Sequence, residues 1–390
     1  MSNVATPTLG VGECSHPVAL RRTVEDLRTG NKTATEHAKR CGARIEARCP
    51  SCSALYRGDA FQVIRTGLFN PATKLPKLFT MVTLTAPGSD RFGETHVRHI
   101  SEKGHVQRCS CKKYHNENDL LLGTPVDPET YNYAGATAFN ANASRLFAVT
   151  MQKLSRILGR KLQVVRVVEF QKRGLVHVHA LVLGTVTQRS LEIVVRGGKN
   201  LRTGRTIAAA QSGGWMWGPQ CQADVKSSAN PGEAIFYLVK VVKYALKDTG
   251  KGECKNYRHG RRMHDAAETG LRCGKSIYEC EHGSRWSAVD VKDTDETTGE
   301  ITYTRSKVYL QGKKVSYTCR KHRRAIEGWG FRGHVLAKSR NWGCTFRGVR
   351  ERRQSWANAN KPSLPTYLLV TWKRLPEVPL SLLALGNSPP

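Results

Sequence analysis

LQVVRVVEFQKRGLVHVHALVLG, residues 162–184, decides the fold at the centre of this chain of 390 residues. Two β-branched runs flank the short polar sequence QKRG, and this pattern predicts an antiparallel β-hairpin. If the turn centres between Lys172 and Arg173, His177 lies across from Glu169 or from its neighbour. The hairpin is therefore expected to bring a carboxylate close to a histidine.

The second strand of this hairpin carries two histidines in the sequence V-H-V-H-A. Side chains two residues apart on a strand project from the same face, so His177 and His179 share one side of the sheet. Two imidazoles that point into one space can bind one divalent ion, and Glu169 can supply a third ligand. The alternative is a strand with two ordinary half-buried histidines. We expect a catalytic Mg²⁺ or Mn²⁺ site with positions left open for a phosphate oxygen.

The charge of the chain points to a polyanionic partner. Its 62 Lys and Arg residues against 31 Asp and Glu give a net charge of +31, which favours nucleic acid. No apolar run reaches the roughly 18 residues that span a bilayer. The first 17 residues lack the apolar core of a signal peptide, which predicts a cytoplasmic protein. In that reducing compartment the 12 cysteines are expected to be thiols or metal ligands.

Several segments resemble one family of proteins. VVEFQKRGLVHVHALV (167–182) resembles the His-hydrophobic-His motif of the HUH endonucleases, and in particular of replication initiators from actinobacterial plasmids and integrative elements. The further matching segments are CPSCSALYRGDAFQVIRTGL (49–68), FTMVTLTAP (79–87), GTPVDPETYNYAGATAFNAN (123–142) and WGFRGHVLAKSRNWGCTF (329–346). The resemblance covers most of residues 14–356.

The resemblance implies an α+β fold with a central antiparallel sheet and flanking helices, the HUH endonuclease core. It implies an enzyme that nicks one DNA strand, forms a 5′-phosphotyrosine and starts rolling-circle replication. The partners would be the origin as duplex and as single strand. A host helicase is also expected, because the chain has no G-x-x-x-x-G-K-[ST] motif. Thr83 and Thr85 match the family's first motif and are expected to belong to a central strand beside the site.

The segment EAIFYLVKVVKYALKD (233–248) is predicted to be the helix that carries the nucleophile. Tyr237 and Tyr244 are seven residues apart and lie nearly on one face. Lys240 and Lys247 can lie beside the Tyr244 hydroxyl and lower its pKa or bind phosphate. The family pattern is Y-x-x-K-Y-x-x-K, and VVKYALKDTG resembles its second half. This resemblance assigns Tyr244 as the nucleophile and Lys247 as its companion.

The helix departs from the family pattern at one position, where Lys240 stands in place of a first tyrosine. A lysine cannot form a phosphotyrosine, so we expect one essential tyrosine. Tyr237 and Lys240 form a Y-x-x-K of their own, and a shifted register with Tyr237 as the nucleophile stays open.

Cysteine spacing predicts zinc near the N-terminus. A C-x-x-C pair at 49–52, with one more cysteine eight residues earlier and another near the start, supplies four thiolates for a tetrahedral ion. The expected ligands are Cys14, Cys41, Cys49 and Cys52, with His16 and His37 as rivals for the place of Cys14. Cys109 and Cys111 could form a second zinc site with His105 or His115. A third group, Cys273, Cys280, His282 and Cys319, is too loosely spaced to predict a site.

Residues 320–361 carry 12 Lys and Arg residues against two Glu, with aromatic residues between them. Cations can follow the phosphates, and aromatic rings can stack on unpaired bases or pack inside the protein. The expected DNA-binding residues are Arg323, Arg324, Arg332, Lys338, Arg340 and Arg347. The interleaved aromatic residues are Trp329, Phe331, Trp342 and Phe346.

These observations predict four regions. They are a zinc-ribbon-like module (1–70), the nickase domain (71–260), a basic DNA-binding region (261–361) and a poorly ordered tail (362–390). Further expectations are helices over 51–68 and 135–158, strands over 78–86 and 220–227, a hairpin or meander within 285–318 and an exposed loop over 190–214. A conjugative relaxase or single-strand transposase would use the same site, and a non-enzymatic zinc-ribbon DNA-binding regulator is the alternative from another class.

Overall fold

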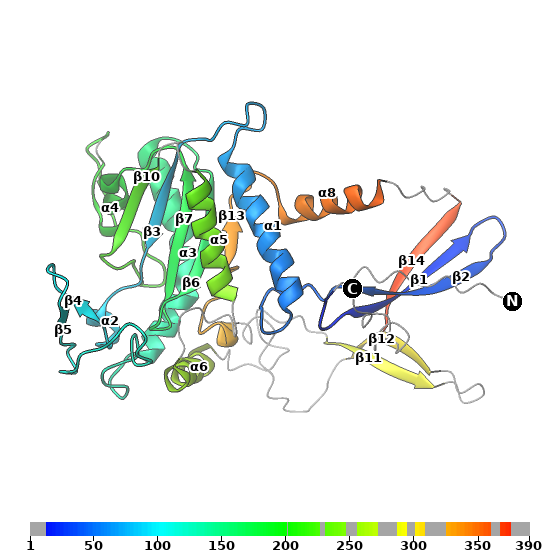
Figure 1. The fold of residues 1–390 in the computed structure, drawn as a ribbon, viewed down its shortest axis with the longest axis horizontal. Helices are drawn as coiled ribbons and strands as arrows, with labels where there is room; N and C mark the ends of the chain where they lie inside the picture. Colours follow the sequence, from blue (N-terminus) through cyan, green and yellow to red (C-terminus); the bar gives the residue numbers. More distant parts are fainter. Residues whose placement is uncertain are drawn as a thin grey trace.

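The computed structural model describes residues 13–200, 202–226, 231–246, 256–271, 287–294, 301–308, 325–359 and 367–375. At its centre is a five-stranded sheet in which all neighbouring strands are antiparallel (Figure 1). In spatial order the strands are β10 (Cys221–Lys226), β3 (Phe79–Leu84), β7 (Val176–Leu183), β6 (Val164–Phe170) and β13 (Leu336–Lys338). A central antiparallel sheet with flanking helices was the fold expected from the sequence, and the architecture confirms it.

The central hairpin has the predicted register. Strands β6 and β7 pair so that Glu169 lies directly opposite His177. Gly174 adopts a φ of 75° in the connecting turn, a conformation that is open to glycine without strain. The turn thus returns the chain in the register that places the acid beside the histidine.

One face of the sheet packs against α3 (Tyr133–Leu158) and α4 (Gln188–Arg196). The even-numbered residues of β7, from Val176 to Val182, are buried on this face together with Phe139 and Leu146 of α3. Helix α3 begins at its Asn132 cap and ends at Gly159, which has a φ of 65°. This confirms the helix expected over 135–158. The expected exposed loop over 190–214 was wrong for α4, whose buried apolar face packs on the sheet and α3.

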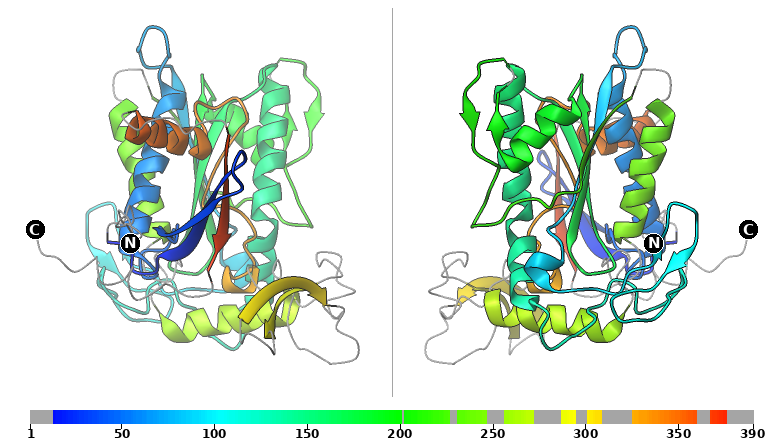
Figure 2. Two further views of the ribbon diagram at one scale, coloured as in Figure 1. Left: turned by 90° about the vertical axis from the view of Figure 1, so that its right-hand side faces the viewer. Right: turned by 90° about the vertical axis from the view of Figure 1, so that its left-hand side faces the viewer.

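The other face packs against α1 (Pro50–Leu68) and α5 (Pro231–Leu246), as Figure 2 shows. Val165, Val167 and Leu181 are fully buried there. Trp342, which follows β13, is also fully buried and donates from Nε1 to the carbonyl of Val63 in α1 at 3.0 Å. The sheet therefore lies between two helical layers, and the odd-numbered residues of β7 face α1 and α5.

Asn140 of α3 fixes the central hairpin. It is fully buried, and its Nδ2 donates to the carbonyls of Gly174 and Trp329, each at 2.9 Å. Its Oδ1 accepts from the backbone N–H of Val176 at 2.9 Å. One amide side chain thus joins α3, the β6–β7 turn and the segment that leads to β13.

A second sheet lies at the opposite end of the molecule from β4 (His99–Ile100) and β5 (Val106–Gln107) (Figure 1). It contains β1 (Val18–Asp26), β2 (Lys32–Lys39) and β14 (Leu368–Arg374), with β1 in the middle. The expectation of a poorly ordered tail was wrong for residues 368–374, because this strand pairs with β1. Strands β1 and β14 are more than 300 positions apart in the sequence, so no local sequence pattern predicts their pairing.

The remaining elements are short or lie at the margins of the two sheets. They are α2 (Ser89–Phe92), α6 (Tyr257–Leu271), α8 (Phe346–Asn358), β8 (Gly198–Lys199), β9 (Thr206–Ile207), β11 (Ser287–Thr294) and β12 (Ile301–Val308). Strands β11 and β12 pair with each other and confirm the hairpin expected within 285–318.

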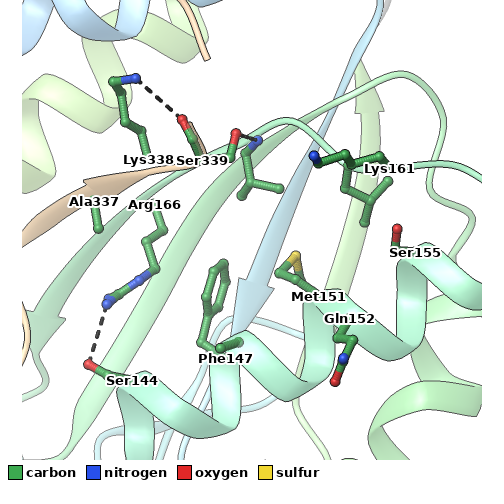
Figure 3. Close-up of a pocket in the computed structure, with 13 residues that line it drawn as sticks. Ser144, Phe147, Met151, Gln152, Ser155, Lys161, Arg166, Ala337, Lys338 and Ser339 are labelled. Carbon is green, nitrogen blue, oxygen red and sulfur yellow. Dashed lines mark hydrogen bonds between the residues drawn. The ribbon is translucent and has the colours of Figure 1, made fainter. Parts of the chain in front are cut away.

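A cavity of about 430 Å³ lies between α3, β6 and β13 (Figure 3). Arg166 lines it and donates from Nη2 to the Ser144 hydroxyl at 3.3 Å. Arg166 is even-numbered on β6 and Glu169 is odd-numbered, so the two project from opposite faces of the sheet. The cavity therefore lies across the sheet from the histidines of β7.

Candidate metal and tyrosine site

Glu169, His177 and His179 come together on the sheet face that packs against α5. One ligand atom from each residue lies within 4.8 Å of the others. The Glu169 Oε1 is 3.3 Å from the His179 Nε2, and the two imidazole rings are 4.5 Å apart between centroids. The three side chains that the sequence predicted as ligands therefore converge on one small volume.

Thr83 of β3 and Thr85, which directly follows that strand, contact the far side of the two imidazole rings. Thr83 Oγ1 lies 3.3 Å from the His179 Nδ1, and Thr85 Oγ1 lies 3.1 Å from the His177 Nδ1. A partner on Nδ1 fixes the tautomer and orientation of a ligand histidine and leaves Nε2 for the ion. Both threonines were expected beside the site, and their contacts with Nδ1 can orient the two rings.

Burial keeps the His177 ring neutral. Removal from water, together with the nearby charge of His179, lowers the pKa of His177 to about 4. The neutral ring keeps a lone pair for a cation at neutral pH. His179 is only 4% exposed, whereas Glu169 and His177 are half-buried, so the open side of the site faces the end of the hairpin that carries Glu169 and His177.

The donor set fits a divalent transition ion. Two imidazole nitrogens and one carboxylate oxygen suit Mn²⁺ better than Mg²⁺, which prefers an all-oxygen shell. Three protein ligands leave further coordination positions for substrate oxygens. A divalent ion held by Glu169, His177 and His179 is therefore chemically consistent with the residues present.

Tyr237 of α5 is the tyrosine whose hydroxyl lies at the site. Its oxygen is 3.3 Å from the His179 Nε2, and its ring meets the imidazole edge-on at 5.2 Å between centroids. The buried Ala234, Ile235 and Leu238 hold α5 against the sheet, which turns Tyr237 toward β7. The Tyr237 side chain is still 41% exposed, so a polymer substrate can reach it.

The other residues predicted on this helix are only partly described. The backbone of Tyr244 belongs to α5, but its side chain lies outside the described residues, as does all of Lys247. Lys240 is exposed on α5, one turn beyond Tyr237. The helical rise places Tyr244 about 10.5 Å along the axis from Tyr237. The assignment of Tyr244 as the nucleophile stays a prediction.

The four cysteines predicted near the N-terminus form one cluster. The Sγ atoms of Cys41 and Cys52, and those of Cys14 and Cys52, are 3.6 Å apart, and those of Cys14 and Cys49 are 3.9 Å apart. A tetrahedral zinc with bonds of about 2.3 Å requires sulfur separations of roughly 3.8 Å. The cluster can therefore hold a metal such as zinc. Cys14 occupies the fourth position, so the rival ligands His16 and His37 are not needed.

The chemistry of Cys49 also suits a metal ligand. Burial opposes ionisation, but the backbone N–H groups of Cys52 and Ser15 outweigh it and lower the pKa of the Cys49 thiol to about 6. A thiolate is the form that binds zinc. Helix α1 carries Cys52 in its first turn and packs on α5 farther along, so the cluster is joined directly to the central domain.

Cys109 and Cys111 lie in a second cluster with His115, one of the two histidines considered for them. The other member is His96, which the sequence analysis missed. His105, the rival, is exposed between β4 and β5. The residues of the proposed third group, Cys273, Cys280, His282 and Cys319, lie outside the described residues.

The basic C-terminal region divides into exposed cations and buried aromatic residues. Arg332, Arg340 and Arg347 are exposed, and Arg323 and Arg324 lie outside the described residues. The Lys338 ammonium instead donates to the carbonyl of Trp342 at 2.7 Å. This hydrogen bond holds Lys338 against the protein, and its role as a DNA contact stays a prediction.

The aromatic residues between these cations belong to the core. Trp329, Phe331 and Trp342 are all less than 10% exposed, and Phe346 stacks on Tyr56 of α1 at 5.1 Å between ring centroids. For the three buried rings this favours packing inside the protein, the second of the two possibilities left open by the sequence. Packing against the two helical layers is their role.

The comparison with protein families gives the class of the chain: it matches a family of replication initiator proteins. The family model RepSA, described as the replication initiator protein of pSAM2, matches residues 2–374, and the chain belongs to this family. A curated replication initiator protein of Streptomyces ambofaciens is 36% identical over 161 residues, which cover 36% of this chain and 33% of that protein. The chain thus aligns with about a third of that relative's length. No solved structure matches.

Among the described helices, none is both long enough and apolar enough to cross a bilayer.

Proposed function

We propose that this protein is an HUH-type endonuclease that nicks one strand of a plasmid or integrative-element origin and so starts rolling-circle replication. The observation that carries the proposal is the meeting of the Tyr237 hydroxyl with the Glu169, His177 and His179 ligand set. Nucleophile and metal ligands within hydrogen-bond distance are the parts that a tyrosine transesterification requires.

The tyrosine oxygen attacks the scissile phosphorus in line with the departing 3′ oxygen. One O–P bond forms to the tyrosine and one P–O bond breaks, so the strand ends as a 5′-phosphotyrosine and a free 3′-hydroxyl. The tyrosine proton is lost and the 3′ oxygen gains one, so no external reactant is consumed. A divalent ion bound by the three ligands supplies charge stabilisation at the phosphate.

Each surrounding residue has a defined part in this reaction. Thr83 and Thr85 hold the two imidazole rings, and the hairpin register holds Glu169 beside them. Lys240 projects from the exposed side of α5 one turn from Tyr237, where an ammonium can bind substrate phosphate. The exposed arginines Arg332, Arg340 and Arg347 are proposed duplex contacts.

We assign the nucleophile to Tyr237. Its hydroxyl lies on the ligand set, whereas Tyr244 stands about 10.5 Å farther along the helix axis. The Y-x-x-K formed by Tyr237 and Lys240 supplies the companion lysine in the same register. Tyr244, with Lys247, is the alternative that the family motif favours.

Other activities would use the same ligand set. A relaxase or a single-strand transposase needs the same histidines and tyrosine, and membership of the replication initiator family favours initiation. A non-enzymatic DNA-binding regulator would have no use for a tyrosine aimed at a metal site. The proposed partners are origin DNA and a host helicase.

The test is nicking of a supercoiled plasmid that carries the origin of the element encoding the protein. With Mn²⁺, wild-type protein should convert supercoiled DNA to open circles, and EDTA should prevent this. His177→Ala and His179→Ala should abolish nicking while retaining duplex binding. The exposed His105→Ala is the matched control and should nick normally. Full nicking by both histidine variants in EDTA would refute the proposal.

A further inference from the structure

The segment from Glu94 to Val126 lies between β3 and α3 and is described throughout. It is almost without a hydrophobic core of its own, because Leu122 is its only large aliphatic or aromatic side chain that is buried. The exposed apolar residues of the same segment are Val97, Ile100, Val106, Tyr114, Leu120 and Leu121. A fold of this length without a core requires another source of stability.

Four metal-binding side chains take the place of that core. One ligand atom from each of His96, Cys109, Cys111 and His115 lies within 4.8 Å of the others. The His115 Nε2 is 3.2 Å from the His96 Nδ1 and 3.2 Å from the Cys111 Sγ. Ligand atoms that each lie about 2.0–2.3 Å from one tetrahedral ion are roughly 3.3–3.8 Å apart.

We propose that His96, Cys109, Cys111 and His115 bind a structural zinc ion. Two thiolates and two imidazoles form a complete tetrahedral set, which is typical of closed structural zinc sites. Asp119 supports the assignment, because its Oδ2 lies 2.6 Å from the His115 Nδ1. A carboxylate on the outer nitrogen orients a ligand histidine and leaves Nε2 for the metal.

The zinc would hold the segment against the hairpin of the metal and tyrosine site. His96 exchanges backbone hydrogen bonds with the chain at 123–124: its N–H donates to Thr124 at 2.8 Å, and its carbonyl accepts from Gly123 at 2.8 Å. Gly123 in turn lies so close to Lys172 that a Cβ there would overlap it. Lys172 lies in the turn that joins Glu169 to His177. His96 is thus connected through Gly123 to the hairpin of the metal and tyrosine site.

Zinc content of the purified full chain tests the proposal, with His96→Ala compared against His105→Ala. The first variant should lose about one zinc per chain relative to wild type, whereas the second should keep all of it. His96→Cys should retain the ion, because Cys₃His is also a tetrahedral zinc set. Trypsin should cut His96→Ala within residues 94–126 about ten times faster than wild type, because the segment opens more often.

Equal zinc content in wild type and His96→Ala would overturn the proposal, as would zinc loss in His105→Ala. If His96→Ala fails to fold, the Co²⁺-substituted wild type decides the matter. Its spectrum should contain the bands of a Cys₂His₂ site in addition to those of a Cys₄ site, and a Cys₄ spectrum alone would refute the site. These measurements do not depend on DNA nicking, so they can fail or succeed independently of the proposed function.

Discussion

Removing the Tyr237 hydroxyl is the most direct test of the assigned nucleophile. Tyr237→Phe keeps the ring that packs edge-on against His179 and deletes only the oxygen that lies 3.3 Å from its Nε2. The lost hydrogen bond is worth about 1 kcal/mol, and the side chain is 41% exposed, so the fold should be retained. Any large loss of activity would therefore reflect chemistry.

The expected magnitude follows from the position of the two tyrosines. Without its nucleophile the enzyme should form the covalent adduct at least roughly 10⁴-fold more slowly, as happens when other covalent catalysts lose theirs. The helical rise places Tyr244 about 10.5 Å farther along the axis, so we do not expect it to attack the same phosphate. Tyr244→Phe should therefore change the rate less than about tenfold.

The assay uses single-stranded oligonucleotides tiled across the origin, incubated with protein and Mn²⁺. The covalent complex is separated on a denaturing gel, and its peptide is identified by mass spectrometry. We expect the modification on Tyr237 and no adduct from Tyr237→Phe. A DNA-linked peptide modified on Tyr244, with Tyr237→Phe still reactive, would show that the family register is correct and that our assignment is wrong.

Four further results are expected. Thr83→Val combined with Thr85→Val should weaken Mn²⁺ binding by about 10- to 100-fold in calorimetry, because the imidazole rings lose their orienting partners; unchanged affinity would contradict that role. Asn140→Ala should lower the free energy of unfolding by about 3 kcal/mol in urea titration, since it leaves three buried backbone groups without partners. Cys49→Ser combined with Cys52→Ser should remove one zinc and lower the Tm of the N-terminal region, and equal zinc by elemental analysis would exclude the Cys₄ site. Duplex affinity should fall with salt at a log–log slope near −5 for about six phosphate contacts, and a flat dependence would argue against a DNA partner.

Local sequence patterns predicted the parts of the fold whose partners are close in sequence. The β6–β7 hairpin carries its own turn and alternation, so the pairing of Glu169 with His177 followed from the chain itself. The helix expected over 135–158 was predicted from its own periodic pattern and from Gly159 as its stop, and the Asn132 cap was found in the structure. Glu169, His177 and His179 could be predicted as metal ligands for the same reason, because all three lie on this hairpin.

The features that the sequence did not predict depend on contacts with residues that are far away in the sequence. Strand β14 forms because β1 offers an open edge, and the prolines around it conceal its short alternating pattern. For Trp329 and Trp342 the sequence left base stacking and internal packing open, because cations surround them, and only contacts with distant segments show that both are buried. His96 was missed because it stands 13 residues before Cys109, farther away than the histidines beside the cysteine pair.

The division of the sheet into two faces explains how one hairpin can serve both folding and chemistry. On β7 the even-numbered residues join the apolar core under α3, and the odd-numbered residues begin with the two histidines and continue into the core under α5. On the proposed function, substrate would approach from the end of the sheet where Glu169 and His177 lie, because Leu181 and α5 close the other end. The segment from Glu94 to Val126 contacts the hairpin turn at that open end. If the protein nicks DNA as we propose, this segment lies next to the hairpin turn at the end where the strand would enter, and a metal that holds the segment in place would also support that end of the site.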